Sequence, residues 1–285
     1  MKIVRYGPAG EERPGAIDSA GKLRSLYPLL RDFTGDMLAP ECLTMLAAID
    51  VEKLPLVPGN PRLGVPVAGI QQIIAVGANY ADHCAEGGIE IPKQPMVFAK
   101  SAGSLCGCED PTVIPESAKT FDWEIELALL IGTGGRDIPH ENALKHVAGY
   151  STAIDFSERS WMLQYGLQLQ LGKSLDTFTP LGPWFVTADE IQDPQTLDLW
   201  LDVNGERRQR GNTAQMVFSV ARIIAFVSQY QTLRPGDLIV TGTPGGVGHC
   251  AKPPHYLKIG DRVSAGVAKL GNHSHEVRAR ADGPF

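Results

Sequence analysis

The stretch Phe121–Gly132 reads FDWEIELALLIG, which has the composition of a buried β-strand that nevertheless carries Glu124 and Glu126. Successive side chains of a strand point to opposite faces, so both carboxylates are expected on one face. The same face continues with Ala128 and Leu130, which are apolar. The stretch therefore predicts two like charges at the edge of a buried surface, where burial and mutual repulsion demand a compensating partner.

A divalent cation would compensate these carboxylates, because it carries two positive charges and prefers oxygen ligands. Asp155 is a candidate third ligand: it ends the apolar stretch Gly149–Asp155, an expected strand, and precedes an expected helix over Ser157–Tyr165. The spacing alone favours a second interpretation, in which two glutamates face solvent and the aspartate caps a helix.

A second group of polar residues follows the expected strand Ile73–Gly77, in the stretch NYADHCAE. His83 and Glu86 are three residues apart and would be neighbours on a helix. Glu86 could then orient His83 and raise its basicity, which suits a general base near neutral pH. An ordinary ion pair at an exposed helix start is the alternative.

Lys173 lies in the stretch LGKSLDTFTP (171–180), among small and apolar residues. A phosphate-binding loop is excluded, because the earlier glycine that its pattern requires falls at Leu167. The lysine could provide a fixed positive charge for an enolate or a carboxylate, or it could be a solvated surface residue.

A glycine-rich turn follows the expected strand Asp237–Thr241 and reads GTPGGVG over 242–248. Backbone N–H groups in such a turn can bind a small anion, such as a substrate carboxylate, with the Thr243 hydroxyl as an additional donor. A plain surface turn has the same composition.

The remaining pattern is one of many short strands and few helices, which favours an α+β fold over a doubly wound sheet. A stretch with four prolines and two glycines, Leu54–Pro66, resembles a linker and divides the chain into a module over 1–65 and a larger domain over 66–285. Further strands are expected at Met1–Tyr6, Leu23–Tyr27, Met96–Lys100, Leu197–Val203, Glu206–Gln209 and Arg262–Ala268, and helices at Pro40–Ile49 and Ser219–Tyr230.

The composition excludes several classes of protein. The chain has 285 residues, 43% of them hydrophobic and 20% charged, and a net charge of −6, which argues against binding nucleic acid or an anionic membrane surface. Its first residues, MKIVRYGPAG, do not resemble a signal peptide, and no apolar run is long enough to span a bilayer. Five cysteines without framework spacing predict reduced thiols and a cytoplasmic protein.

Six stretches together resemble the fumarylacetoacetate hydrolase family, over about residues 68–275: GANYADHCAE (77–86), PMVFAK (95–100), DWEIELALLIG (122–132), AIDFSER (153–159), GKSLDTFTPLGPW (172–184) and RPGDLIVTGTPGGVG (234–248). The N-terminal module and KPPHYLKIGD (252–261) resemble the subgroup labelled ureidoglycolate lyase, some of whose members hydrolyse 2,4-diketo-3-deoxy sugar acids.

The resemblance implies a mixed β-roll with flanking helices, preceded by a small N-terminal α/β module, and a homodimer. It also implies a site for Mg²⁺ or Mn²⁺ and a lid over residues 84–94. Met162 stands where relatives commonly have glutamine, so a polar substrate contact is expected to be lost or replaced. The implied residues are the metal ligands Glu124, Glu126 and Asp155, the catalytic residues His83, Glu86 and Lys173, and the substrate-binding residues Phe98, Lys100, Arg159, Tyr165 and Thr243.

The implied activity is hydrolysis of the C3–C4 bond of a 2,4-diketo acid, such as 2,4-diketo-3-deoxy-L-rhamnonate, to pyruvate and a second acid such as lactate. Oxaloacetate decarboxylation and isomerisation of a hydroxymuconate-type diacid are alternatives that use the same site. A non-catalytic protein that binds a metal and a 2-oxo acid is an alternative of another class.

Overall fold

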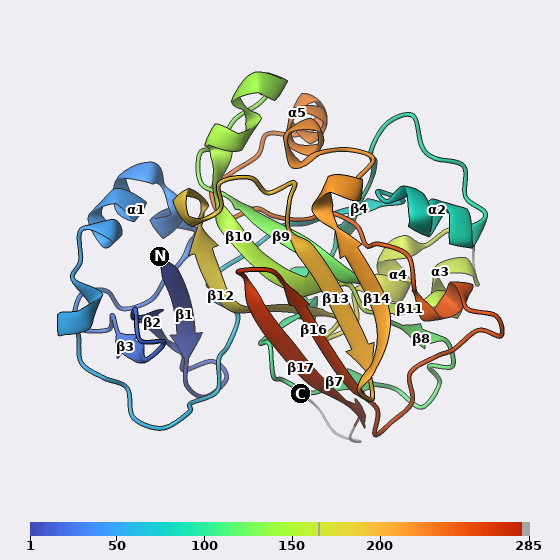
Figure 1. The fold of residues 1–285 in the computed structure, drawn as a ribbon, viewed down its shortest axis with the longest axis horizontal. Helices are drawn as coiled ribbons and strands as arrows, with labels where there is room; N and C mark the ends of the chain where they lie inside the picture. The colour runs from blue at the N-terminus through green and yellow to red at the C-terminus, as the bar shows by residue number, and fades with distance from the viewer. Residues whose placement is uncertain (165, 281–285) are drawn as a thin grey trace.

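The computed structural model describes residues 1–164 and 166–280, which are built mainly from β-sheets (Figure 1). Ten strands form the largest sheet, in the order β3 (Leu23–Ser25), β2 (Arg13–Ile17), β1 (Lys2–Tyr6), β12 (Thr179–Thr187), β10 (Val147–Ile154), β9 (Ile125–Ile131), β15 (Leu238–Val240), β4 (Ile73–Gly77) and β5 (Met96–Lys100), with β6 (Leu105–Cys106) beside β12. This arrangement confirms the expected α+β class.

A second sheet has five strands, in the order β14 (Glu206–Asn212), β13 (Asp198–Val203), β16 (Arg262–Val267), β17 (Gly271–Ala279) and β7 (Thr112–Ile114). The expected hairpin joins β13 to β14 through Asn204 and Gly205, whose φ angles of 53° and 80° are those that tight hairpin turns require. Its apolar side chains share a core with one face of the large sheet.

Strand β9 lies inside the large sheet, and its alternation places side chains in two separate cores. Ile125, Leu127 and Leu129 belong to the core shared with the five-stranded sheet. Ala128 and Leu130 belong to the core on the other face, which also contains side chains from the N-terminal residues. A strand buried on both faces reads as an almost continuous apolar run, as FDWEIELALLIG does.

The N-terminal residues continue the large sheet, because β1 pairs antiparallel with β12. Helix α1 (Pro40–Ala47) confirms the helix expected there and contributes Leu46 to the second core. The division at residue 65 stays a prediction, since this sheet runs across it.

The helices are short, apart from α5 (Val220–Tyr230), which confirms the expected helix and is capped by the Ser219 side chain. Three others lie near one another in Figure 1: α2 (Ala81–Gly87), α3 (Arg159–Leu163) and α4 (Leu169–Lys173). Short 3-10 helices occupy Gly35–Leu38, Val51–Lys53, Ala102–Ser104, His140–His146, Ala188–Glu190, Thr213–Gln215 and Gly248–Cys250. None of the helices in the described residues is long and apolar enough to cross a bilayer.

The helix expected over Ser157–Tyr165 begins two residues later than predicted. Ser157 and Glu158 instead form the short strand β11, which pairs with β8 (Phe121–Asp122), and α3 follows at Arg159. This pairing brings Arg159 close to the first residues of the FDWEIELALLIG stretch. Tyr165 lies outside the described residues.

Candidate metal centre and catalytic pocket

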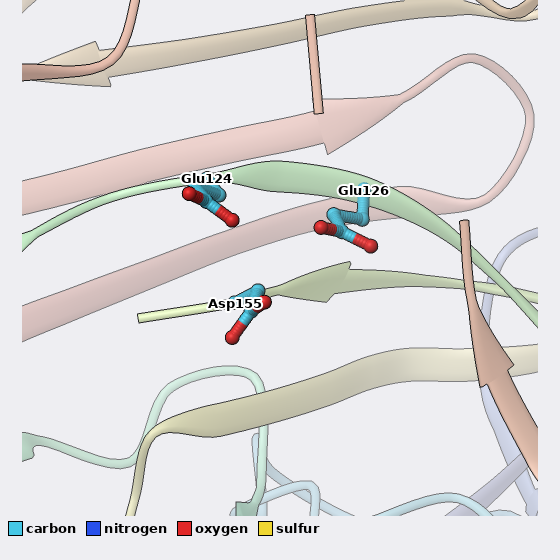
Figure 2. A group of neighbouring side chains, drawn as sticks. All are labelled: Glu124, Glu126 and Asp155. Atoms are coloured by element: carbon cyan, nitrogen blue, oxygen red, sulfur yellow. The ribbon is translucent and has the colours of Figure 1, made fainter. Parts of the chain in front are cut away.

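Three buried carboxylates meet where β9 and β10 lie side by side (Figure 2). Glu124 directly precedes β9, Glu126 belongs to it, and Asp155 directly follows β10. The antiparallel register pairs Ala153 with Glu126, and the Asp155 backbone N–H donates to the Glu124 carbonyl at 2.8 Å. One ligand oxygen from each carboxylate lies within 4.8 Å of the other two, which is a separation that a single cation can bridge.

Two buried lysines face this cluster. The Lys173 ammonium, at the end of α4, donates to Glu124 Oε2 at 2.7 Å and to Asp155 Oδ2 at 2.6 Å. The Lys100 ammonium, on β5, donates to Asp155 Oδ1 and to the Phe178 carbonyl. Lys173 therefore contacts two of the implied metal ligands, whereas Lys100 contacts one of them, Asp155.

Arg159 completes the positive side of the cluster. Its Nη2 lies 2.6 Å from Glu124 Oε1 and 2.8 Å from Asp122 Oδ2. Asp122 is fully buried and also accepts hydrogen bonds from the backbone N–H groups of Trp123, Gly248 and His249. Asp122 was not predicted from the sequence, although it lies in the same stretch as the two glutamates.

The two glutamates differ in their electrostatic surroundings. Burial, together with the charges of Asp155 and Glu124, raises the pKa of Glu126 well above its ordinary value. Burial opposes ionisation of Glu124 too, but Lys173 and Arg159 outweigh it and hold the pKa of Glu124 well below its ordinary value. The charge of Lys173 only partly offsets these effects on Glu126, and this fits a site for a divalent cation with oxygen ligands.

The expected pair of His83 and Glu86 forms on α2. His83 Nδ1 lies 2.8 Å from Glu86 Oε1, and Glu86 Oε2 accepts a hydrogen bond from the Gly246 N–H at 2.7 Å. A carboxylate on Nδ1 fixes the ring orientation and leaves Nε2 as the available base. Because His83 lines the same cavity as the three carboxylates, the pair can act on a molecule bound in that cavity.

The glycine-rich turn binds carboxylates of the protein itself. Gly242, Gly246 and Gly248 each donate a backbone N–H, at 2.7 Å, to Glu126, Glu86 and Asp122 respectively. These three N–H groups therefore bind carboxylates of the protein, and not a substrate carboxylate as expected from the sequence. The turn acts instead as a common support for the metal cluster, the His–Glu pair and the Arg159 partner.

Thr243 lines the pocket, but its hydroxyl is already engaged. It donates to the Ile125 carbonyl at 2.8 Å and accepts from Gln209 Nε2 at 2.8 Å. Gln209 reaches it from β14 of the second sheet and also accepts from the Ile125 N–H. Gln209 could not be predicted from the sequence, because its contacts depend on the packing of two sheets.

A cavity of about 330 Å³ joins these groups. Most of the implied site residues line it: Phe98, His83, Arg159, Lys173, Thr243 and the three metal ligands. Glu86 and Lys100 do not line the cavity, but they contact His83 and Asp155, which do. His249 also lines the cavity, and its Nδ1 lies 2.9 Å from the Tyr256 hydroxyl, a contact that the sequence did not suggest. The complete lining within the described residues is Val76, Gly77, Ala78, His83, Ile89, Met96, Phe98, Glu124, Glu126, Asp155, Arg159, Met162, Leu163, Leu167, Leu169, Lys173, Gly242, Thr243 and His249.

Comparison with known proteins places this geometry in a family. The model of the fumarylacetoacetate hydrolase C-terminal domain matches residues 72–278. The chain belongs to the fumarylacetoacetate hydrolase family. It is 48% identical over 279 residues, 98% of this chain and 99% of the other, to a Burkholderia orbicola protein whose name specifies a hydrolase without a substrate.

Solved structures of this family share both the fold and its extent. A maleylpyruvate hydrolase from Sphingobium sp. SYK-6, solved in complex with manganese(II) and pyruvate, is 28% identical, with a TM-score of 0.82 over 99% of this chain and 100% of that chain. A probable 2-hydroxyhepta-2,4-diene-1,7-dioate isomerase from Mycobacterium abscessus is 36% identical, with a TM-score of 0.81 over the same shares. Since hydrolases and isomerases share this fold, the fold alone does not determine the reaction.

Proposed function

We propose that this protein hydrolyses the C3–C4 bond of a 2,4-diketo acid and releases pyruvate and a second carboxylic acid. The observation that carries the proposal is that His83, whose ring Glu86 orients, and the three buried carboxylates line one cavity. Hydrolysis needs a base for water as well as a grip on the 2-oxo acid, and this cavity offers both. Decarboxylation needs no attacking water.

The cation proposed for this site is Mg²⁺ or Mn²⁺, which favour the same hard oxygen ligands, and Glu124, Glu126 and Asp155 would hold it. When bound, it would supply a Lewis acid for the oxygens of a 2-oxo acid. The manganese and pyruvate in the Sphingobium relative support this choice of metal and substrate class.

The protein's own residues would perform the remaining steps. His83 accepts a proton from water, with Glu86 stabilising the imidazolium that forms, and the resulting hydroxide attacks the C4 carbonyl. The C3–C4 bond then breaks, C4 leaves as a carboxylic acid, and its bonding electrons pass to C3 as the pyruvate enolate. Lys173 stabilises the negative charge of the enolate, which becomes pyruvate when C3 is protonated.

Three finer parts of the proposal rest on the resemblance and the composition. The sugar acid 2,4-diketo-3-deoxy-L-rhamnonate is one substrate of the proposed kind, and it would yield lactate as the second acid. We further propose a homodimer and a cytoplasmic location, the latter supported by five cysteines that are all unpaired.

A coupled assay that measures pyruvate release tests the function. With Mg²⁺ present, we expect turnover of 2,4-diketo acids, loss of that turnover on chelation, and a roughly 10²–10⁴-fold lower kcat for His83→Ala. Mn²⁺ binding by His83→Ala should stay near that of the wild type, because His83 is outside the carboxylate cluster.

The alternatives give different results in the same assay. A decarboxylase would release pyruvate from oxaloacetate faster than from any 2,4-diketo acid, with little effect of His83→Ala. An isomerase would change the ultraviolet absorbance of a hydroxymuconate-type diacid without releasing pyruvate. A non-catalytic binding protein would retain Mn²⁺ and turn over none of these compounds.

A further inference from the structure

The catalytic cavity has a polar floor and an apolar mouth. The carboxylates Glu124, Glu126 and Asp155 are between 2% and 5% exposed, which places them at the bottom. Leu163 and Leu167 are 61% and 68% exposed and line the same cavity, which places them at its opening. The outer wall is made of Ile89, Met96, Leu163 and Leu167, which are all exposed. Phe98 and Met162 line the cavity deeper, because the Phe98 ring lies 5.7 Å from Lys173 Nζ and Met162 is 8% exposed. The exposed His249 also lines the cavity.

The cations that line the cavity are already paired. Arg159 contacts Asp122 and Glu124, and Lys173 contacts Glu124 and Asp155. If the three carboxylates also bind a divalent cation, Arg159 and Lys173 still interact with groups at the floor of the cavity. A second carboxylate, at the far end of a substrate, would thus meet hydrocarbon at the mouth, with His249 as the single remaining titratable partner among the described lining residues.

Away from the floor, a hydroxyl group on the substrate would have few side-chain partners among the described lining residues: His249, whose Nδ1 already contacts Tyr256, and Thr243. Among the described residues that line the cavity, Thr243 is the one with a hydroxyl, and both its donor and one acceptor position are used by Ile125 and Gln209. A polar group that loses water without gaining a partner costs free energy, whereas each buried methylene gains about 0.8 kcal/mol, which is roughly fourfold in affinity.

We infer that this site selects 2,4-diketo acids whose acyl tail beyond C4 is an uncharged hydrocarbon group, in preference to hydroxylated or carboxylated tails. The inference rests on the proposed function for the position of the diketo acid, whose charged end occupies the floor. The tail then lies along the apolar outer wall. Within the proposed reaction, this narrows the substrate away from sugar acids and toward alkyl- or aryl-substituted acylpyruvates.

Substrates matched in carbon number test the inference. We expect kcat/KM to rise roughly fourfold per methylene from 2,4-dioxopentanoate to 2,4-dioxoheptanoate. The kcat/KM for 2,4-dioxoheptanoate should exceed that for 2,4-dioxoheptanedioate by about tenfold or more. The kcat/KM for 2,4-dioxohexanoate should likewise exceed that for its 5-hydroxy derivative. Higher kcat/KM for the dicarboxylate or for the hydroxylated compound would overturn the inference and leave the proposed function intact.

Failure of the proposed function is recognised separately, when none of these compounds releases pyruvate. Binding then decides the inference: with Mg²⁺ present, calorimetry should give a lower Kd for 2-oxohexanoate than for 2-oxohexanedioate, which has the same number of carbons. Equal or reversed affinities would overturn it.

Variants locate the effect on the outer wall. Leu167→Ala should lower the ratio of kcat/KM between 2,4-dioxoheptanoate and 2,4-dioxopentanoate by about fourfold. Leu171→Ala is the matched control, because Leu171 is 54% exposed, lies in the adjacent α4 and does not line this cavity. An unchanged ratio in Leu167→Ala, or an equal decrease in both variants, would contradict a tail bound along this wall.

Discussion

At the scale of single residues, Glu126 is the side chain whose position is hardest to explain without a ligand. It is 2% exposed, and its neighbours Asp155 and Glu124 are both acidic. Lys173 binds Glu124 and Asp155, whereas Glu126 receives the backbone N–H of Gly242. A residue that serves the fold alone would not need to be ionisable here, so the carboxylate is explained by binding rather than by stability.

Glu126→Gln should therefore have opposite effects on stability and on metal binding. The amide oxygen can still accept the Gly242 N–H, and the buried acid is removed. The free energy of unfolding of the metal-free protein should therefore rise, by on the order of 1–3 kcal/mol. Mn²⁺ affinity should fall by about tenfold or more, since one ligand oxygen with a charge is lost.

Urea denaturation in the presence of a chelator and calorimetric titration with Mn²⁺ measure the two effects. Glu190→Gln is a suitable control, because Glu190 has a side chain that is 54% exposed and lies outside the cluster. If Glu126→Gln lowered stability and left Mn²⁺ affinity unchanged, Glu126 would be a structural residue.

At the scale of elements, the glycine-rich turn connects groups that the sequence keeps far apart. Gly246 has a φ of 103° and donates its N–H to Glu86. A Cβ at this position would approach the Arg208 carbonyl oxygen to 2.1 Å. The turn therefore requires glycine both for its backbone conformation and for its contact with β14.

Gly246→Ala should lower the free energy of unfolding, by on the order of 1–3 kcal/mol, and should also reduce turnover, because Glu86 loses its support. Gly260→Ala is the matched control: Gly260 has a φ of 94°, but nothing lies within 4 Å of its expected Cβ. Thermal denaturation and the pyruvate assay should show a larger loss of stability for Gly246→Ala and reduced activity in that variant alone. Equal effects in both variants would mean that the positive φ, and not the contact, determines the outcome.

The elements also show what the sequence could and could not predict. β9 was predictable because alternation places the two glutamates on one face and Ile125, Leu127 and Leu129 on the other. β12 was not, because Pro180 and Pro183 resemble strand breakers, although the strand pairs with both β1 and β10. Asp122 was missed because two of its hydrogen-bond donors, the backbone N–H groups of Gly248 and His249, lie more than a hundred residues further along the chain.

At the scale of the whole molecule, the N-terminal residues are tied to the larger body by ion pairs as well as by the β1–β12 pairing. Arg62 donates to both carboxylate oxygens of Asp110, at 2.6 Å each, and to Glu12 at 2.8 Å. Arg62 belongs to the proline-rich stretch Leu54–Pro66 that resembled a linker, whereas Asp110 comes after this stretch in the sequence. The segment is therefore fastened to the structure at its middle.

This ion pair makes part of the stability depend on pH. Burial opposes ionisation of Asp110, but hydrogen bonds from Arg62 and the Gly107 N–H outweigh it and lower the pKa of Asp110 below its ordinary value of 3.8. A carboxyl group with a lowered pKa in the folded state stabilises it fully above pH 3.8, and this contribution is lost as the pH falls through the folded-state pKa. Asp110→Asn should thus be less stable than the wild type at pH 7, by on the order of 1–3 kcal/mol, and the difference should shrink below pH 4.

Urea denaturation of both proteins at pH 7, 5 and 3 tests this dependence. The difference should be equal at pH 7 and pH 5 and clearly smaller at pH 3, because protonation removes in the wild type the charge that the substitution removes in the variant. Asp50→Asn provides the control, since Asp50 forms an exposed pair with Lys53 three residues away and joins no distant parts of the chain, so its effect should be small at each pH. A difference for Asp110→Asn that stays constant down to pH 3 would assign its cost to lost packing instead of to the Arg62 ion pair.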